Sequence, residues 1–324
     1  MSVSATYWKR TTDNAIWGVD ASPSSGVGTL LDNSFSLGSN GVLGSLTAFI
    51  FTKPDFSWNL TANFNKQSSE ITAVKGQPVV IISSAGSTNY TLTPGLKIGQ
   101  LFGYLGLHSV DQVNPATGTP YIAAGDQASY VVASNGWVAN KTTKQPYFTP
   151  NQYSFGDPNP LFNMGFINEF KYKNFLTFNI QFDWINGSHI YNQTKEWMYR
   201  DGINADYQQP ITIDGQTGAW TAFYRGVYAQ RSRNGTKSYF YEDASFVRLR
   251  NVSIAFDFAE AFKIKGIRKL QLVLSGRNLM TWTKYTGLDP EVSSGTNNSA
   301  WDRGTDHNTL PNYKAYQVGI NLGF

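Results

Sequence analysis

The sequence predicts an all-β protein, an antiparallel transmembrane β-barrel segment of about eight strands. Two observations predict it: apolar and polar residues alternate along several separate segments, and long and short connections alternate between those segments. Successive side chains of a strand point to opposite sides of a sheet, so each alternating segment has one apolar face and one small, polar face. In a membrane barrel these faces are the lipid-facing exterior and the wet interior.

The last twelve residues, 313–324, show the alternation without interruption. Aromatic or aliphatic residues stand at every second position from Tyr316 to Phe324, and Gln, Gly and Asn stand between them. Four further segments alternate as cleanly: 56–65, 176–184, 251–258 and 270–275. We expect each of these five segments to be a strand.

Three more segments, 2–12, 40–52 and 160–172, are also expected to be strands, although two of them depart from strict alternation. Phe49, Ile50 and Phe51 are contiguous, and Ile167 is out of phase with its apolar neighbours. The predicted connections are long at 13–39, 67–159, 191–243 and 284–312 and short at 53–55, 173–174 and 259–266. Outer-membrane barrels have short turns on the periplasmic side, so every short connection is expected there.

The composition fits this class. Aromatic residues make up 15% of the chain and charged residues 15%, against roughly 25% charged residues in soluble proteins. The mean hydropathy of −0.32 does not argue against a membrane barrel, because half of each strand faces water. The start MSVSATYWKR lacks the apolar core of an export signal, so we expect the leader that a barrel needs to be missing from these 324 residues.

Several function classes are disfavoured by the composition. There is no cysteine, which excludes disulfides and cysteine metal sites. The net charge of +4 is small and scattered, whereas a nucleic-acid partner would require a concentrated basic stripe. No nucleic acid is therefore expected among the partners.

Residues 239–292 carry a resemblance to a known family. They contain the segments YFYEDASFVRLRNVSIAFDF and IRKLQLVLSGRNLMTWTKYTGLDPEV, which resemble the C-terminal signature of the SusC/RagA family of TonB-linked outer-membrane transporters. Residues 56–76, 95–105 and 156–192 resemble consecutive earlier parts of the same family in the same order. The resemblance therefore covers nearly the whole chain.

The resemblance implies a fold and a function. Family members have a signal peptide, a TonB box, a globular plug and a barrel of roughly 22 strands, so residues 1–324 are expected to be the C-terminal part of such a barrel, with the other parts absent. The implied function is TonB-dependent import of an oligosaccharide or a peptide across the bacterial outer membrane. The implied partners are a SusD-like surface lipoprotein, TonB, outer-membrane lipid and the barrel-assembly machinery; no cofactor and no enzyme activity are expected.

Two sets of residues are candidate sites. Aromatic side chains in the long loops are possible cargo contacts, because sugar rings stack on aromatic faces; the alternative is that they pack the loops together. These residues are Trp137, Tyr147, Trp220, Tyr224, Tyr228 and Trp301. The apolar residues of the last strand resemble the signal that the assembly machinery binds: Tyr316, Val318, Ile320, Leu322 and Phe324.

Titratable residues do not predict a catalytic or metal site. The three histidines are far apart in sequence, and Asp302, Asp306 and His307 form the only acidic and imidazole cluster, which is interpreted as a solvated loop. The spacing of aspartates after residue 105 does not suit calcium. Asp183 and Glu169 are expected to line the interior, and Asp289-Pro290 is interpreted as a turn.

Two alternatives remain open at this stage. The first is a stand-alone eight-stranded barrel that acts as an adhesin or structural protein, closed by pairing of segments 2–12 and 313–324. The small residues of the polar face argue for a wider lumen, because small barrels fill their interior with side chains. The second is a soluble carbohydrate-binding sandwich, which would need a core on the apolar face.

Overall fold

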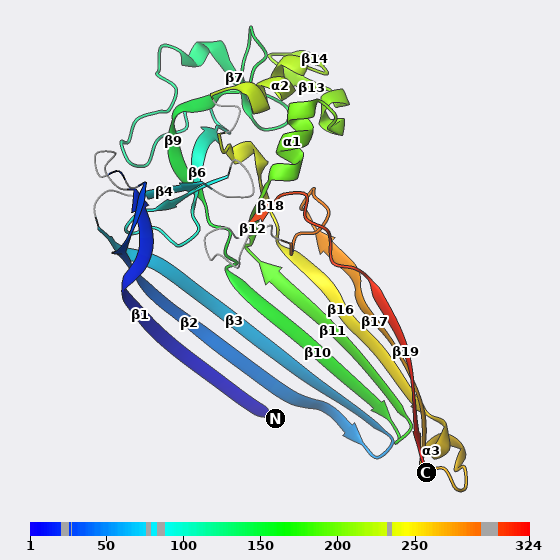
Figure 1. Cartoon of the computed structure of the whole chain (residues 1–324). Helices are drawn as coiled ribbons and strands as arrows, with labels where there is room; N and C mark the ends of the chain where they lie inside the picture. Colours follow the sequence, from blue (N-terminus) through cyan, green and yellow to red (C-terminus); the bar gives the residue numbers. More distant parts are fainter. Residues whose placement is uncertain (21–25, 27, 76–78, 83–87, 232–234, 293–303) are drawn as a thin grey trace.

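The computed structural model describes residues 1–20, 26, 28–75, 79–82, 88–231, 235–292 and 304–324. One large antiparallel sheet forms the lower part of the molecule in Figure 1, and a body built from the long connections lies at its upper end. The eight strands of the sheet follow in the order β1 (Ser2–Asp20), β2 (Thr29–Lys53), β3 (Phe56–Val74), β10 (Phe162–Tyr172), β11 (Leu176–Asn186), β16 (Phe246–Asp257), β17 (Lys269–Thr283) and β19 (Ala315–Gly323). The predicted fold class and strand number are confirmed.

The large sheet is open. Strands β1 and β19 lie at its opposite edges, and within the described residues each pairs on one side only, β1 with β2 and β19 with β17. The pairing of 2–12 with 313–324 that a closed eight-stranded barrel would require does not occur in the described part of the chain. The two edge strands therefore present unpaired backbone groups.

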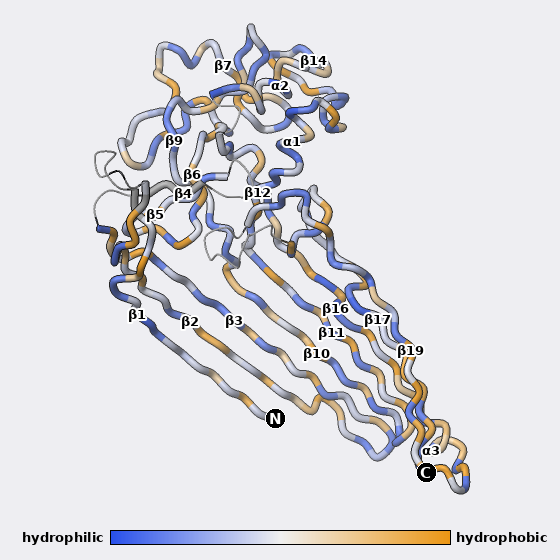
Figure 2. Tube along the Cα trace, viewed as in Figure 1, coloured by the Kyte–Doolittle hydropathy of each residue, from blue (hydrophilic) through white to orange (hydrophobic). Residues whose placement is uncertain are grey.

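The register places the alternating residues on two faces, which run as rows across the strands. Phe170, for example, lies opposite both Trp58 and Phe178. Figure 2 shows the resulting alternation of hydrophobic and hydrophilic residues along the strands. We call the two sides of the sheet the apolar face and the polar face. The apolar face includes Trp58, Leu60, Phe64, Phe166, Phe170, Phe178, Ile180, Val252, Ile254, Phe256, Leu270, Leu272, Leu274, Val318, Ile320 and Leu322. The polar face includes Ser4, Ser45, Thr47, Asn59, Thr61, Asn63, Gly165, Glu169, Asn179, Gln181, Ser253, Ser275 and Gln317.

The two irregular segments have physical explanations. Phe49 lies opposite Asn59 but Phe51 lies opposite Trp58, so a bulge adds one residue and shifts the phase of the strand between them. Ile167 is on the polar face, in register with the rest of β10. Its neighbour Asn168 is therefore on the apolar face, where its side-chain oxygen accepts a hydrogen bond from the Trp58 indole at 3.0 Å.

The prediction of a long connection at 13–39 is wrong. Strand β1 continues to Asp20 and β2 already begins at Thr29, so most of this segment is paired. The alternation is hidden because register shifts interrupt the pairing between Thr12 and Ala15 and between Ser36 and Leu37. The extended strands carry a small buried cluster of Phe35, Ile71 and Leu92 above the main sheet.

The short connections agree with the predictions. Pro54 and Asp55 join β2 to β3, and Lys173 to Phe175 join β10 to β11. The connection between β16 and β17 contains a short helix, α3 (Phe258–Phe262). The Asp257 carboxylate begins this helix by accepting hydrogen bonds from the backbone N–H groups of Ala259 and Glu260 at 3.0 and 3.3 Å.

The loop body contains small sheets and two longer helices. A four-stranded sheet consists of β4 (Val79–Ile82), β5 (Asn89–Leu92), β6 (Leu101–Gly106) and β9 (Phe148–Gly156). Further pairs and a three-stranded sheet are β7 (Tyr130–Val132) with β8 (Val138–Asn140), β13 (Ile211–Ile213) with β14 (Gln216–Gly218), and β15 (Tyr241–Asp243), β12 (His189–Asn192) and β18 (Thr305–Asp306). The helices are α1 (Gln193–Asp201) and α2 (Thr221–Ala229), with 3-10 turns at Gln127–Ser129, Ala205–Gln208 and Ser238–Phe240. None of the helices in the described residues is long and apolar enough to cross a membrane.

Candidate functional site

The polar face carries hydrogen-bonding side chains that connect neighbouring strands. The Ser45 hydroxyl donates to Asn63 Oδ1 at 2.9 Å, and the hydroxyls of Thr47 and Thr61 are 3.3 Å apart. The same kind of cross-strand contact joins Asn59 to Glu169, Asn179 to Ser253 and Asn321 to Gln271. The face therefore offers amide and hydroxyl groups, which suit contact with water or with a polar ligand better than the packing of a dry core.

A hollow of about 500 Å³ opens on this face over strands β1, β2, β3, β10 and β11. Its volume is within the range of small-molecule sites. Its lining is mostly small and neutral, and Asp183 is its only charged residue. The lining residues are Ser4, Thr6, Leu43, Gly44, Ser45, Asn63, Phe64, Asn65, Asn163, Met164, Gly165, Asp183 and Ile185.

Charged residues gather farther along the sheet, on β11 and β16. Arg248 Nη2 lies 2.5 Å from Asp289 Oδ1, and the side chains of this pair are only 2% and 5% exposed. Arg248 Nη1 also lies 2.6 Å from Glu291, which in turn pairs with Arg250 at 2.6 Å. Arg250 Nε lies 2.5 Å from Asp183 of β11. We call these five residues the charge cluster.

The charge cluster fixes the connection between β17 and β19 to the large sheet. Asp289 accepts hydrogen bonds from the backbone N–H groups of Glu291 and Asn312 at 2.9 and 3.0 Å, in addition to the bond from Arg248. Burial by itself would raise the pKa of Asp289, but the hydrogen bonds from Arg248 and from these two N–H groups lower it below its ordinary value. The carboxylate is therefore charged at neutral pH. It joins the backbone at Glu291 and at Asn312, two distant points of the same connection, to Arg248 of the large sheet.

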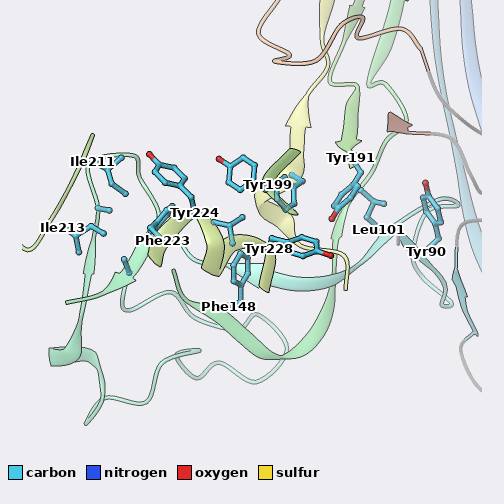
Figure 3. Packing of buried hydrophobic residues seen from close by; sticks show 14 residues of the cluster. Tyr90, Leu101, Phe148, Tyr191, Tyr199, Ile211, Ile213, Phe223, Tyr224 and Tyr228 are labelled. Atoms are coloured by element: carbon cyan, nitrogen blue, oxygen red, sulfur yellow. The ribbon is translucent and has the colours of Figure 1, made fainter. Parts of the chain in front are cut away.

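The loop body has its own core, shown in Figure 3. It is unusually rich in tyrosine, and the tyrosine hydroxyls have partners: Tyr199 donates to Asp206 at 2.7 Å and Tyr191 donates to Glu196 at 3.1 Å. Burial raises the pKa of both tyrosine hydroxyls, so they are neutral donors at physiological pH. The connections beyond the sheet thus form a packed body, and 14 of the described residues make up its buried core.

Four of the predicted loop aromatics, Trp137, Trp220, Tyr224 and Tyr228, lie in or beside this core, whereas Tyr147 packs against a second cluster of Leu107, Ile122 and Val138. Tyr224 and Tyr228 are buried, and Tyr224 donates to the Gln209 carbonyl at 2.9 Å. Trp220 and Tyr147 are half-buried and donate to backbone carbonyls of Ile211 and Tyr121, respectively. Trp137 is also half-buried, with its ring centroid 4.1 Å from His108 and 4.9 Å from Tyr239. Trp301 lies outside the described residues.

These positions support the packing interpretation for Tyr224 and Tyr228 in this conformation. Contact between cargo and the half-buried rings of Trp137, Tyr147 and Trp220 stays a prediction. The structure brings the five described aromatics into one body, although they come from segments up to 91 residues apart, a separation that follows from their numbers 137 and 228.

The predicted assembly signal lies on an edge strand. Tyr316, Val318, Ile320 and Leu322 are on the apolar face of β19, opposite Gly276, Leu274, Leu272 and Leu270. Their side chains are 55–77% exposed, and that of Phe324 is 78% exposed. The strand geometry fits the expected alternation, and the recognition role stays a prediction.

The cluster around His307 differs from the solvated loop that the sequence indicated. Asp306 is only 3% exposed and accepts a hydrogen bond from the Tyr285 hydroxyl at 2.6 Å. The His307 ring packs edge-on against Trp197 at 4.5 Å between centroids. Asp302 lies outside the described residues, and among the residues that are described no group of three His, Asp or Glu side chains could hold a metal ion.

The charge cluster is the feature that sequence reasoning missed. The sequence predicts Asp183 as an interior-lining residue and Asp289 as a turn residue, and it does not connect either of them with Arg248 or Arg250. A signal was present, because two arginines within an alternating strand require partners when they are not at a membrane surface. The partner could not be identified, because Asp289 and Glu291 are separated from Arg248 by about forty residues and a complete strand.

Comparison with known proteins gives a consistent result. No family model matches the chain. All of the chain aligns with TonB-dependent receptor P3 of Formosa agariphila at 28% identity, covering 32% of that protein. It is also 23% identical, over 91% of its length, to TonB-dependent receptor SusC of Bacteroides thetaiotaomicron, of which it covers 27%.

The fold agrees with the sequence comparison. The chain superposes over 99% of its length on a chain in the structure of the RagAB peptide transporter, with a TM-score of 0.65 and 21% sequence identity. The match covers 33% of that other chain. The chain thus spans about a third of the length of the relatives that it matches. The resemblance predicted from residues 239–292 and the three earlier segments is confirmed: along its whole length, the chain is related to the TonB-dependent receptors of the SusC/RagA family.

Proposed function

We propose that this chain is the C-terminal part of the barrel of a TonB-dependent importer in the bacterial outer membrane. The observation that carries the proposal is the open eight-stranded sheet with a continuous apolar face and a small, polar face. An apolar face of this extent needs lipid around it, and a face of amides and hydroxyls needs a wet interior. In this proposal the protein transports its cargo and catalyses no chemical reaction.

The open edges support a larger barrel over a stand-alone one. Strands β1 and β19 present backbone groups that require partners, and additional strands of a longer protein would supply them. The small side chains of the polar face support a wide lumen, since an eight-stranded barrel would need larger side chains to fill its interior. The soluble sandwich is disfavoured because no second layer covers the apolar face in the described residues.

The relatives also suggest a class of cargo and the partner proteins. One relative is part of a complex described as a peptide transporter, and another is the receptor SusC. We infer that the cargo is an oligosaccharide or a peptide, that a SusD-like lipoprotein covers the loop body, and that TonB acts on a plug inside the complete barrel. The hollow lined by Asn63, Asn163 and Asp183 would lie on the inner wall, facing that plug or the passing cargo.

Uptake by cells tests the proposal. The gene for the natural protein that carries this chain would be deleted, and uptake of labelled oligosaccharide and peptide mixtures would be compared with that of the parent strain. Loss of uptake of one mixture, restored by the gene and abolished again when TonB is inactivated, is expected. Unchanged uptake of both mixtures, together with recovery of the protein in the soluble fraction without detergent, would show that the proposal is wrong.

A further inference from the structure

The end of the sheet that carries the short connections has a second type of surface. Aromatic side chains form a nearly continuous band there, from β2 to α3. Successive ring centroids are 4.8 to 6.5 Å apart for the pairs Phe51–Phe56, Phe56–Phe170, Tyr172–Phe175, Phe175–Phe256, Phe256–Phe258 and Phe258–Phe262.

The band lies on the apolar face. Phe51 is opposite Trp58, Tyr172 is opposite Phe56, and Phe256 is opposite Leu272, which all belong to apolar rows. The rings of α3 continue from Phe256, and Phe262 at the end of this helix is 69% exposed. The helix therefore extends the apolar surface beyond the last paired residues of the strands.

Basic residues lie in or next to each of the three short connections, beside the band. The Lys53 ammonium lies 5.1 Å from the centroid of the Phe51 ring, and the Lys173 ammonium lies 5.6 Å from that of Tyr172. Lys265 and Arg268 follow α3 and are exposed. We call these four cations and the aromatic band the basic rim.

The acidic residues near the basic rim leave most of this charge unbalanced. Glu260 pairs with Lys263 at 2.6 Å, and Asp257 accepts hydrogen bonds at the start of α3. Asp55 is exposed in the first turn. In the described residues, no ion pair joins an acidic side chain to Lys53, Lys173, Lys265 or Arg268.

We propose that the basic rim binds the phosphate groups of anionic phospholipids in the membrane leaflet at the short-turn end. Rings on the apolar face match the apolar chains of a phospholipid. The cations match its anionic headgroup: Lys53 and Lys173 lie beside two of the rings, and Lys265 and Arg268 follow α3 within six residues of Phe262. This inference rests on the proposed function, because it requires that the sheet spans a membrane. It adds a defined lipid partner and places α3 in the headgroup region.

Lipid retention by the purified protein tests the inference. The natural protein that carries this chain would be purified in detergent and exposed to phosphatidylglycerol or phosphatidylcholine, and the bound lipid would be counted by native mass spectrometry. The test variant is Lys265→Gln/Arg268→Gln. The matched control is Lys141→Gln/Lys284→Gln, which removes the same charge away from the short connections: Lys141 follows β8 in the loop body, and Lys284 follows the opposite end of β17.

The wild type and the control are expected to bind phosphatidylglycerol more tightly than phosphatidylcholine. The test variant should bind phosphatidylglycerol about thirtyfold more weakly, since a basic residue near an anionic surface contributes about 1 kcal/mol. Phe262→Ser, which removes an exposed ring but no charge, should lower the retention of both lipids. Equal preference for the two lipids in the wild type, or equal retention by the wild type and the test variant, would overturn the inference.

Two further measurements separate the possible explanations. Inorganic phosphate at the same concentration is expected not to displace the lipid, and displacement would mean that the surface is a simple phosphate site and that the lipid assignment is wrong. Uptake is measured in the same strains. Absence of lipid preference with normal uptake counts against the basic rim alone, whereas absence of uptake with normal lipid preference counts against the proposed function alone.

Discussion

Arg248 of β16 and Asp289, in the connection between β17 and β19, form a buried ion pair across 41 residues, with 2.5 Å between Nη2 and Oδ1. This pair attaches an irregular segment to a regular sheet. A single unpaired charge left at this place is costly because the site is almost inaccessible to water.

We therefore expect Asp289→Ala to destabilise the full-length barrel by about 1–3 kcal/mol, which is less than the cost of a fully unpaired buried charge because Arg248 keeps its contact with Glu291. Urea unfolding in detergent measures the effect. The double variant Arg248→Met/Asp289→Ala removes both charges and should cost clearly less than the sum of the two single variants. Additive costs would mean that the two side chains do not interact.

The ion pair of Asp289 should also make the unfolding free energy depend on pH. The pKa of Asp289 is lower in the folded state, so the folded state binds fewer protons than the unfolded state in the acidic range, and the stabilisation is lost as the pH falls through the folded pKa. The difference in unfolding free energy between the wild type and Asp289→Asn should be constant from about pH 5 to about pH 8 and should shrink below about pH 4. A difference that shrinks above pH 5 would contradict this assignment.

The two faces of the large sheet should respond differently to charge. Ile180 lies on the apolar face between Asn168 and Val252, whereas Asn179 lies on the polar face and donates to Ser253 at 3.3 Å. Ile180→Arg should cost about 2–4 kcal/mol if the residue is near the membrane midplane, and Asn179→Arg should cost little. Urea unfolding in lipid measures both, and equal costs would refute the assignment of the faces.

Phe324 should matter for assembly. It follows β19, whose apolar residues are exposed along an edge, and an exposed edge can pair with another strand while alternate side chains fill pockets. Phe324→Asp should strongly reduce the amount of assembled full-length protein, whereas Asn321→Ser on the polar face should not. Pulse-chase labelling distinguishes slow insertion from reduced stability after insertion, and a normal insertion rate would reject the role in recognition.

The loop body should be sensitive at Gly103. A Cβ atom added there would lie 2.2 Å from the Thr236 carbonyl oxygen, which is backbone and cannot move aside easily. Gly103→Ala should therefore lower the unfolding free energy of the loop body by about 1–3 kcal/mol, the usual cost of overpacking a site. Gly125→Ala is the control, because nothing lies within 4 Å of its Cβ position. Faster proteolysis of the loops in Gly103→Ala but not in Gly125→Ala is the expected result.

Residue alternation is enough to predict the eight strands of the large sheet and most of their faces. Alternation has a period of two in any strand, so residues such as Phe178 and Asn179 are assigned to opposite faces without knowledge of their neighbours. Alternation does not identify a strand where its period of two is interrupted. The bulge at Phe49–Phe51 shifts the phase, and the interruptions between Thr12 and Leu37 made two long strands resemble a loop.

Tertiary structure alone decided the contacts between distant segments. The pairing of Arg248 with Asp289, the burial of Asp306 and the packing of Tyr224 depend on how long connections fold back over the end of the sheet. No local period encodes such contacts, because they arise from side-chain shape and from partners for buried charges. Alternation thus predicted the sheet from neighbouring residues, whereas the loop body and the charge cluster required the complete three-dimensional arrangement.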